Sequence, residues 1–157
     1  MTSDHAPKFK IDIRKENFDI NLEMKYLTDA NLKVGAVASF VGKVRDLSKN
    51  SKLKFMEIEH YPEMSEKVLR DLCKKATLRW ELQGISLIHR IGKLYPGENI
   101  VLLVIASVHR AEAFDASLFL MDFLKSEAPF WKKETTITGS IWVEENQVDK
   151  QKLLRWQ

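Results

Sequence analysis

The residues with the clearest chemical potential lie in one segment, DFLKSEAPFWKKE, which spans residues 122–134. Lys125 lies four residues after Met121 and seven after Leu118, so it continues the apolar face of a predicted helix. A lysine in that place must extend to solvent or sit at the edge of a cavity. Lys132 follows on a strand and can converge with Lys125 across the corner. Two ammonium groups held close repel each other, which lowers at least one pKa and can provide a base at neutral pH.

The aromatic residues of this segment alternate with its lysines. Phe130 and Lys132 share one face of the predicted strand, whereas Trp131 and Lys133 share the other. The pattern is typical of a solvated helix end, and it also suits a pocket for an anion. These residues alone leave both interpretations open.

A second cluster, His109 and Arg110, stands where an apolar strand ends and a helix begins. Helix N-termini present unpaired N–H groups and positive potential, so an added His and Arg would form an anion cradle, typically for phosphate. The alternative is a pair that only caps the helix and faces water.

A third cluster lies in the stretch FVGKVRD, at a predicted strand end. Lys43 and Arg45 alternate outward there, with Val44 between them and Gly42 before them. An arginine in this place can hold a phosphate through two parallel hydrogen bonds. A polar strand end that faces water is again the alternative.

Other reactive residue types favour structural roles. His60 and His89 are single histidines in or beside β segments, with no spacing that resembles a zinc site, so we predict no metal centre. We expect their rings to be hydrogen-bonded to the sheet. Cys73 lies on the core stripe of a helix and is predicted to be a small buried hydrophobe rather than a nucleophile.

Length and composition limit the class of protein. The chain has 157 residues, 45% of them hydrophobic and 30% charged, which is the balance of one soluble globular domain. No apolar run approaches the ~20 residues that span a bilayer, and no secretory signal is visible, so we expect no membrane contact. One cysteine excludes an internal disulfide framework and fits a reducing cytoplasm. The net charge of +3 says little about partners.

The elements that must position these clusters form an α+β domain over residues 1–157, with 1–10 and 147–157 as its termini. We expect two main helices on a largely antiparallel sheet, with a core stripe of Phe114, Leu118 and Met121 on the second helix. The predicted helices cover residues 19–27, 62–82 and 111–126, and the tail forms a last helix or a docked arm. The predicted strands cover residues 9–13, 33–45, 54–61, 85–94, 99–109, 130–137 and 140–143, and a polar loop covers 46–53.

In this order, the clusters resemble the large catalytic subunit of molybdopterin synthase. The matching stretches tile the chain from about Val34 to Glu145 and are GAVASFVGKVRD, EIEHYPEMSEK, HRIGKLYPGE, SVHRAEAF, MDFLKSEAPFWKKE and IWVE. Each stretch is weak alone, but the set at this spacing is highly specific. It favours the pocket over the solvated end for Lys125 and Lys132.

The resemblance implies a definite chemistry. The family adds two sulfurs to a cyclic pyranopterin monophosphate and so forms the dithiolene that later binds molybdenum. The sulfur arrives as a thiocarboxylate on the C-terminal Gly-Gly of a small ubiquitin-like partner, whose tail enters a pocket of the large subunit. Family members form a central homodimer with one small subunit at each end, and their fold is described as an α/β hammerhead. The resemblance implies no metal, redox cofactor or catalytic cysteine.

Site residues are carried over by position. Lys125 and Lys132 fall on the family's two key lysines, and Arg45, His109 and Arg110 fall on its substrate-phosphate pocket. The residues that flank these positions, and are expected to help bind the substrate, are Lys43, Val44, Lys133 and Glu134.

Two other functions remain to be weighed against this one. A basic module could bind nucleic acid with the same lysines and aromatic rings, but acidic residues are interleaved and no known RNA- or DNA-binding pattern occurs. An inactive homologue could scaffold the small partner alone. The presence of both lysines and of His109 and Arg110 argues against that reading.

Overall fold

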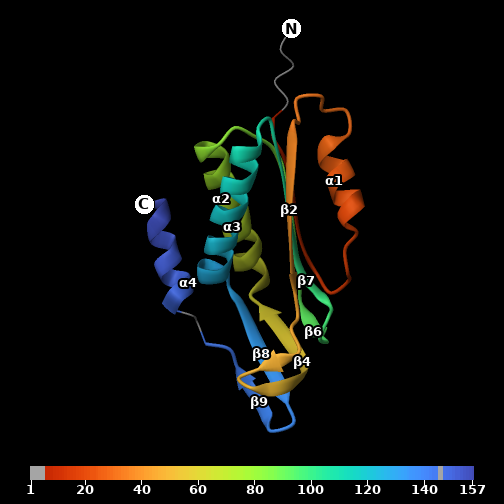
Figure 1. Ribbon diagram of the computed structural model, residues 1–157, viewed down its shortest axis with the longest axis vertical. Helices are drawn as coiled ribbons and strands as arrows, with labels where there is room; N and C mark the ends of the chain where they lie inside the picture. The colour runs from red at the N-terminus through yellow and green to blue at the C-terminus, as the bar shows by residue number, and fades with distance from the viewer. Residues whose placement is uncertain (1–5, 145–146) are drawn as a thin grey trace.

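The computed structural model describes residues 6–144 and 147–157 and confirms the α+β class (Figure 1). Its helices are α1 (Ile20–Thr28), α2 (Pro62–Arg79), α3 (Arg110–Glu127) and α4 (Gln147–Lys152), with a short 3₁₀ helix at Leu153–Trp156. Its strands are β1 (Lys8–Arg14), β2 (Ala36–Lys43), β3 (Leu47–Ser48), β4 (Ser51–His60), β5 (Leu82–Arg90), β6 (Gly92–Leu94), β7 (Asn99–Ser107), β8 (Phe130–Thr136) and β9 (Gly139–Trp142). No helix in the described part of the chain is long and apolar enough to cross a membrane.

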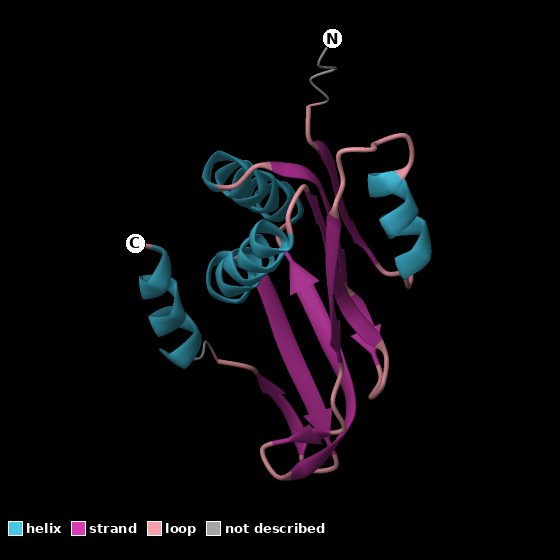
Figure 2. Cartoon of the chain, turned by 45° about the horizontal axis from the view of Figure 1, so that its top comes forward, coloured by secondary structure: helices cyan, strands magenta, loops and turns pink. Residues whose placement is uncertain are grey.

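The first sheet has the order β1-β5-β7-β2 and forms the centre of the molecule. β1 runs parallel to β5, whereas the other pairs are antiparallel. Helices α2 and α3 cover one face and α1 covers the other (Figure 2). The central strands β5 and β7 are therefore apolar on both sides, with Leu87 and Leu103 in the core under α2 and α3 and Ile88 and Leu102 in the core under α1.

The sequence predicted a single sheet, but the structure has a second one. It has the order β3-β4-β8-β9, with β6 also paired to β4, and all its pairs are antiparallel. It extends from one end of the first sheet, below α2 and α3 in Figure 1. Ile58 of β4 lies opposite Lys132 of β8, and His60 lies opposite Phe130. The predicted closing hairpin of β8 and β9 is confirmed.

The polar loop predicted over residues 46–53 is instead a short hairpin. Leu47 and Ser48 pair with Lys52 and Ser51 at the start of β4. The two turn residues both have positive φ, 43° at Lys49 and 70° at Asn50. Two such residues in succession give the turn twist that tight hairpins require, and asparagine tolerates that conformation.

The core stripe predicted for α3 is wrong at Phe114 and Leu118, whereas its third member, Met121, packs against the core. Phe114 and Leu118 are 67% and 44% exposed, and α3 turns a second stripe towards the sheet. That buried stripe consists of Ala113, Ala116, Phe119, Leu120 and Leu124. Helical periodicity identifies both stripes but cannot say which one packs, and the alanines allow the closer approach to the strands. Phe114 and Leu118 therefore form an apolar strip on the outside of the chain, which we call the α3 strip.

The first long helix ends earlier than predicted. α2 stops at Arg79, before the predicted end at residue 82, and β5 begins at Leu82. Cys73 is fully buried on α2, as predicted, and burial raises the pKa of its thiol to about 12. A thiol with so high a pKa is not a nucleophile at neutral pH.

The C-terminal tail combines the two forms predicted for it, since it contains a last helix, α4, and is docked against the rest of the chain. The indole Nε1 of Trp156 donates a hydrogen bond to Asp122 Oδ2 at 2.8 Å. Its ring makes T-shaped contacts with the rings of Trp80 and Phe119, whose centroids lie 5.7 and 5.3 Å from its own. These contacts hold α4 beside α3 (Figure 1), next to the end of α3 that carries Lys125.

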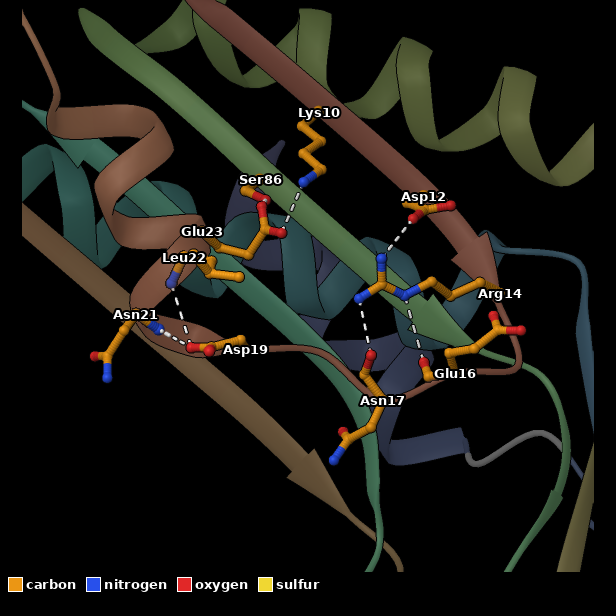
Figure 3. Close-up of polar contacts among 10 residues, drawn as sticks. All are labelled: Lys10, Asp12, Arg14, Glu16, Asn17, Asp19, Asn21, Leu22, Glu23 and Ser86. Carbon is orange, nitrogen blue, oxygen red and sulfur yellow. Dashed lines mark hydrogen bonds and ion pairs between the residues drawn. The ribbon is translucent and has the colours of Figure 1, made fainter.

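A buried carboxylate fixes α1 to the opposite face of the sheet. Glu23 lies between Lys10 of β1 and Ser86 of β5 (Figure 3), and each partner donates to one of its oxygens at 2.7 Å. Asp19 caps the helix by accepting hydrogen bonds from the N–H groups of Asn21 and Leu22. A charged group this deep is stable because both oxygens are satisfied.

Replacing Glu23 with alanine is therefore expected to destabilise the protein by about 2 kcal/mol, because Ser86 and Lys10 would lose a charged acceptor. Urea unfolding measures the change. Glu66→Ala is the matched control, since Glu66 pairs with Arg70 on the exposed face of α2 and should contribute at most about 0.5 kcal/mol. Equal effects of the two substitutions would contradict the anchoring role of Glu23.

Candidate functional site

A cavity of about 850 Å³ lies where the end of α3, the end of β2 and the strand β8 meet. Its polar wall is made by Lys43, Arg45, His89, Lys125, Lys132, Glu134, Glu144 and Asp149. Its apolar wall includes Phe40, Met56, Met121, Leu124 and Phe130. The cavity therefore combines several cationic groups with a hydrophobic interior, as a site for an anionic organic ligand requires.

Lys125 and Lys132 converge on this cavity, as their places in the sequence predicted. Lys125 is exposed on the last turn of α3, and Lys132 is half-buried on β8. Ala128 ends the helix in an extended conformation, and Pro129 follows, so the chain turns sharply between the two lysines. The lysines are therefore brought together by this local turn from α3 into β8 and not by a long-range contact.

The environment of Lys132 lowers its pKa. Burial is the largest cause, and the Lys125 ammonium adds to it by repulsion. The carboxylates of Glu134 and Asp149 act in the opposite direction. A lysine with a lowered pKa exchanges protons more readily near neutral pH than a surface lysine does.

We expect Lys132 to titrate at lower pH than the exposed lysines, and Lys125→Ala to raise its pKa because one repelling charge is removed. NMR titration of isotopically labelled lysine side chains measures both effects, with Lys132→Arg used to assign the signal. A Lys132 signal that titrates together with the surface lysines would contradict the expected environment.

Lys43 and Arg45 reach the cavity from the end of β2, but Val44 does not. Val44 is buried in the main core, its N–H donates to the carbonyl of Glu98, and its carbonyl accepts from the N–H of Gly97. These bonds fix the strand end, so Val44 acts as the internal anchor between two outward cations. In this stretch, the side chains available to a ligand are those of the two adjacent residues, Lys43 and Arg45.

His109 and Arg110 lie at the other end of α3 from Lys125. His109 is the N-cap residue, in an extended conformation and without a side-chain capping bond, and both side chains are exposed. Because Lys125 lies 15 residues after Arg110 on α3, about 23 Å of helix separates them from it. Within one chain the structure does not bring them to Arg45.

Lys133 and Trp131 point away from the cavity. They lie on the opposite face of β8, where the Lys133 ammonium is 5.5 Å from the ring centre of Trp142 and Trp131 is 50% exposed. Glu134, the next residue, returns to the cavity wall. The strand alternation in the sequence predicts this division.

Sequence reasoning missed some residues of the cavity. His89 was expected to serve the sheet alone, yet it lines the cavity and stacks on Phe130. Asp149 reaches the cavity from α4, where its carbonyl also accepts a hydrogen bond from Ser126. No local pattern marks either residue, because their roles depend on tertiary contacts. Among residues 6–144 and 147–157, no group of three His, Cys, Asp or Glu side chains could hold a metal ion.

Comparison with known proteins places this site in a family. The family described as MoaE protein matches residues 13–127, well over half of the 157 residues. The chain belongs to the MoaE protein family. The molybdopterin synthase catalytic subunit of Ralstonia nicotianae is 48% identical to it over 146 residues, 93% of this chain and 83% of that protein.

Solved structures of MoaE relatives have the same fold. The molybdopterin biosynthesis MoaE protein from Burkholderia ambifaria MC40-6 has a TM-score of 0.81 and 44% identity, covering 94% of this chain and 97% of that one. Molybdopterin synthase from Staphylococcus aureus has a TM-score of 0.79 and 31% identity, covering 85% and 96%. The fold that forms the cavity is thus shared across almost the whole chain.

Proposed function

We propose that this chain is the catalytic subunit of a molybdopterin synthase and transfers sulfur to a cyclic pyranopterin monophosphate. The observation that carries the proposal is the convergence of Lys125 and Lys132 on one cavity in a chain of the MoaE family. A small ubiquitin-like partner supplies the sulfur as a C-terminal thiocarboxylate. A cytoplasmic location, also proposed, suits a chain whose one cysteine is a buried free thiol.

The two lysines have different parts in this proposal. The thiocarboxylate is an anion, and its attack on the pterin side chain creates further negative charge and requires proton transfers. Lys125, exposed beside the cavity, stabilises the developing oxyanion and donates a proton to it. Lys132, held deeper on β8, positions the tail and the substrate. Neither role needs a metal or a thiol from this chain.

The phosphate of the substrate requires fixed cations, and Lys43 and Arg45 can supply two of them from the strand end. Glu134 then borders the substrate from β8, whereas Lys133 lies on the opposite face of the strand and takes no part in the cavity. Three carboxylates in the same wall, from Glu134, Glu144 and Asp149, suit a small ligand better than the long phosphate backbone of a nucleic acid.

His109 and Arg110 belong to the proposed site through a second copy of the chain. The α3 strip is an exposed apolar surface between them and Lys125, and Phe40 beside the cavity is 40% exposed. Such a strip favours burial against another subunit. In a symmetric dimer with its two-fold axis near Leu118, the neighbouring copy's His109 and Arg110 would lie beside Lys125. The homodimer therefore completes the anion pocket.

Genetic complementation tests the proposal in cells. A bacterium that lacks its own molybdopterin synthase large subunit should regain molybdoenzyme activity when this chain is expressed, and Lys125→Ala should not restore it. Immunoblotting controls for equal expression of the two forms. Well-expressed wild-type protein that restores no activity would contradict the proposed function.

A further inference from the structure

His89 is a wall residue of the cavity to which the proposed reaction gives no role. It lies near the end of β5, and only 4% of its surface is exposed. Its imidazole stacks on Phe130, with ring centres 3.9 Å apart and planes 10° apart, and Phe130 stacks in turn on His60. The ring is therefore held rigidly between the first sheet and β8.

Hydrogen bonding decides which nitrogen of His89 carries the proton. Nδ1 lies 2.8 Å from the carbonyl oxygen of Arg90, and because that oxygen can only accept, Nδ1 must donate. Burial lowers the pKa of His89 to about 3; the Arg90 carbonyl opposes this shift, and Lys132 and His60 add to it. The ring is neutral at physiological pH, which leaves Nε2 with a free lone pair.

His89 is one of the residues that line the cavity. The hydrogen bond described for the His89 ring involves Nδ1. Nδ1 is therefore engaged within the chain, and Nε2 is the nitrogen of this wall residue that is left for a ligand.

A neutral acceptor is unusual among the side chains of this wall. The other polar side chains that line the cavity are cations, which donate, and carboxylates, which accept but carry a negative charge. A carboxylate beside a phosphate ester and a thiocarboxylate would repel both. An imidazole lone pair can accept from an N–H group of the same ligand without that repulsion.

We propose that His89 is a specificity-determining residue whose Nε2 accepts a hydrogen bond from a ring N–H of the bound heterocycle. The inference rests on the proposed function, which makes that heterocycle a pterin. The cations bind the phosphate whatever ring it carries. His89 instead favours ligands whose ring has an N–H group at its edge over ligands whose ring has none. The stacked Phe130 fixes the direction of the lone pair.

Two substitutions and two ligands test this role. His89→Phe keeps a flat ring but has no acceptor, whereas His89→Gln offers a carbonyl oxygen. Calorimetry at pH 7.5 measures the Kd of cyclic pyranopterin monophosphate, and competition measures the affinity of inorganic phosphate. We expect His89→Phe to weaken pterin binding roughly ten-fold and to leave phosphate binding unchanged. The pterin affinity of His89→Gln should lie between those of the wild type and His89→Phe.

Each other outcome overturns the inference. Unchanged pterin affinity in His89→Phe would show that Nε2 makes no contact with the ring. Equal losses of pterin and phosphate affinity in both variants would mean that His89 only supports the shape of the cavity. A wild-type protein that binds phosphate but not the pterin would overturn the proposed function as well, so the two failures are distinguishable. Thermal unfolding confirms that the variants are folded.

Discussion

Lys125→Ala is expected to lower kcat for dithiolene formation by about 10²- to 10⁴-fold, because it removes both the proton donor and the charge that stabilises the developing oxyanion. The fold should persist, since Lys125 is exposed and makes no hydrogen bond or ion pair that the structure describes. The affinity for the small partner should change little, because one exposed ammonium contributes little to a large interface. Steady-state assays with purified subunits measure the first effect, and calorimetry measures the affinity.

Two further variants make this prediction specific. Lys125→Arg retains the positive charge but cannot release its proton near neutral pH, so we expect it to recover only a small part of the lost rate. Lys74→Ala, on the exposed face of α2, should retain full activity. Full activity in Lys125→Ala would exclude its catalytic role, and full recovery in Lys125→Arg would reduce that role to charge alone.

Mixed dimers are expected to recover activity that neither parent has. If the pocket combines Lys125 of one copy with Arg110 of the other, a dimer of Lys125→Ala with Arg110→Ala contains one intact pocket and one doubly defective pocket. Random mixing makes half of the dimers mixed, so about a quarter of the wild-type activity should return. Co-refolding the two variants and assaying the mixture measures this recovery.

The matched control uses two residues of the same pocket from the same chain. Mixing Lys125→Ala with Lys132→Ala produces no intact pocket, because both lysines line one cavity of one chain, so activity should stay near zero. Recovery in this control would mean that subunits exchange segments. If the mixture of Lys125→Ala and Arg110→Ala recovers no activity, the site is not shared between two copies, and the N-terminal end of α3 does not belong to it.

Local sequence predicted those parts of the site that depend on local geometry. Lys125 and Lys132 are separated by one corner, so the end of a helix, a proline and strand alternation indicated that they could converge, and the resemblance favoured the pocket over a solvated end. The same alternation explains why Glu134 returns to the cavity and Lys133 does not.

Longer-range parts of the site could not be obtained in this way. The α3 strip has the spacing of a core stripe, and only the packing of Ala113 and Ala116 against the sheet shows that it faces outward. His89 looked like a sheet histidine because its contact with Phe130 joins two elements that are distant in the sequence.

The separation of His109 and Arg110 from the cavity that holds Lys125 and Arg45 follows from the length of α3, which the sequence did indicate. Lys125 lies 15 residues after Arg110 on one helix, so the two are about 23 Å apart, whatever the rest of the fold does. The resemblance groups these residues in one phosphate pocket, whereas the geometry of one chain separates them. A second subunit is the simplest physical way to satisfy both.

The source of the transferred sulfur is the most direct test of the proposed activity. The purified chain is mixed with cyclic pyranopterin monophosphate and a small partner whose C-terminal thiocarboxylate carries a heavy isotope of sulfur, and the product is weighed by mass spectrometry. We predict a dithiolene in which both sulfurs are heavy, and no product when the partner ends in an ordinary carboxylate. A pterin that stays unchanged in the presence of the bound, labelled partner would contradict the assignment of this chain as the catalytic subunit.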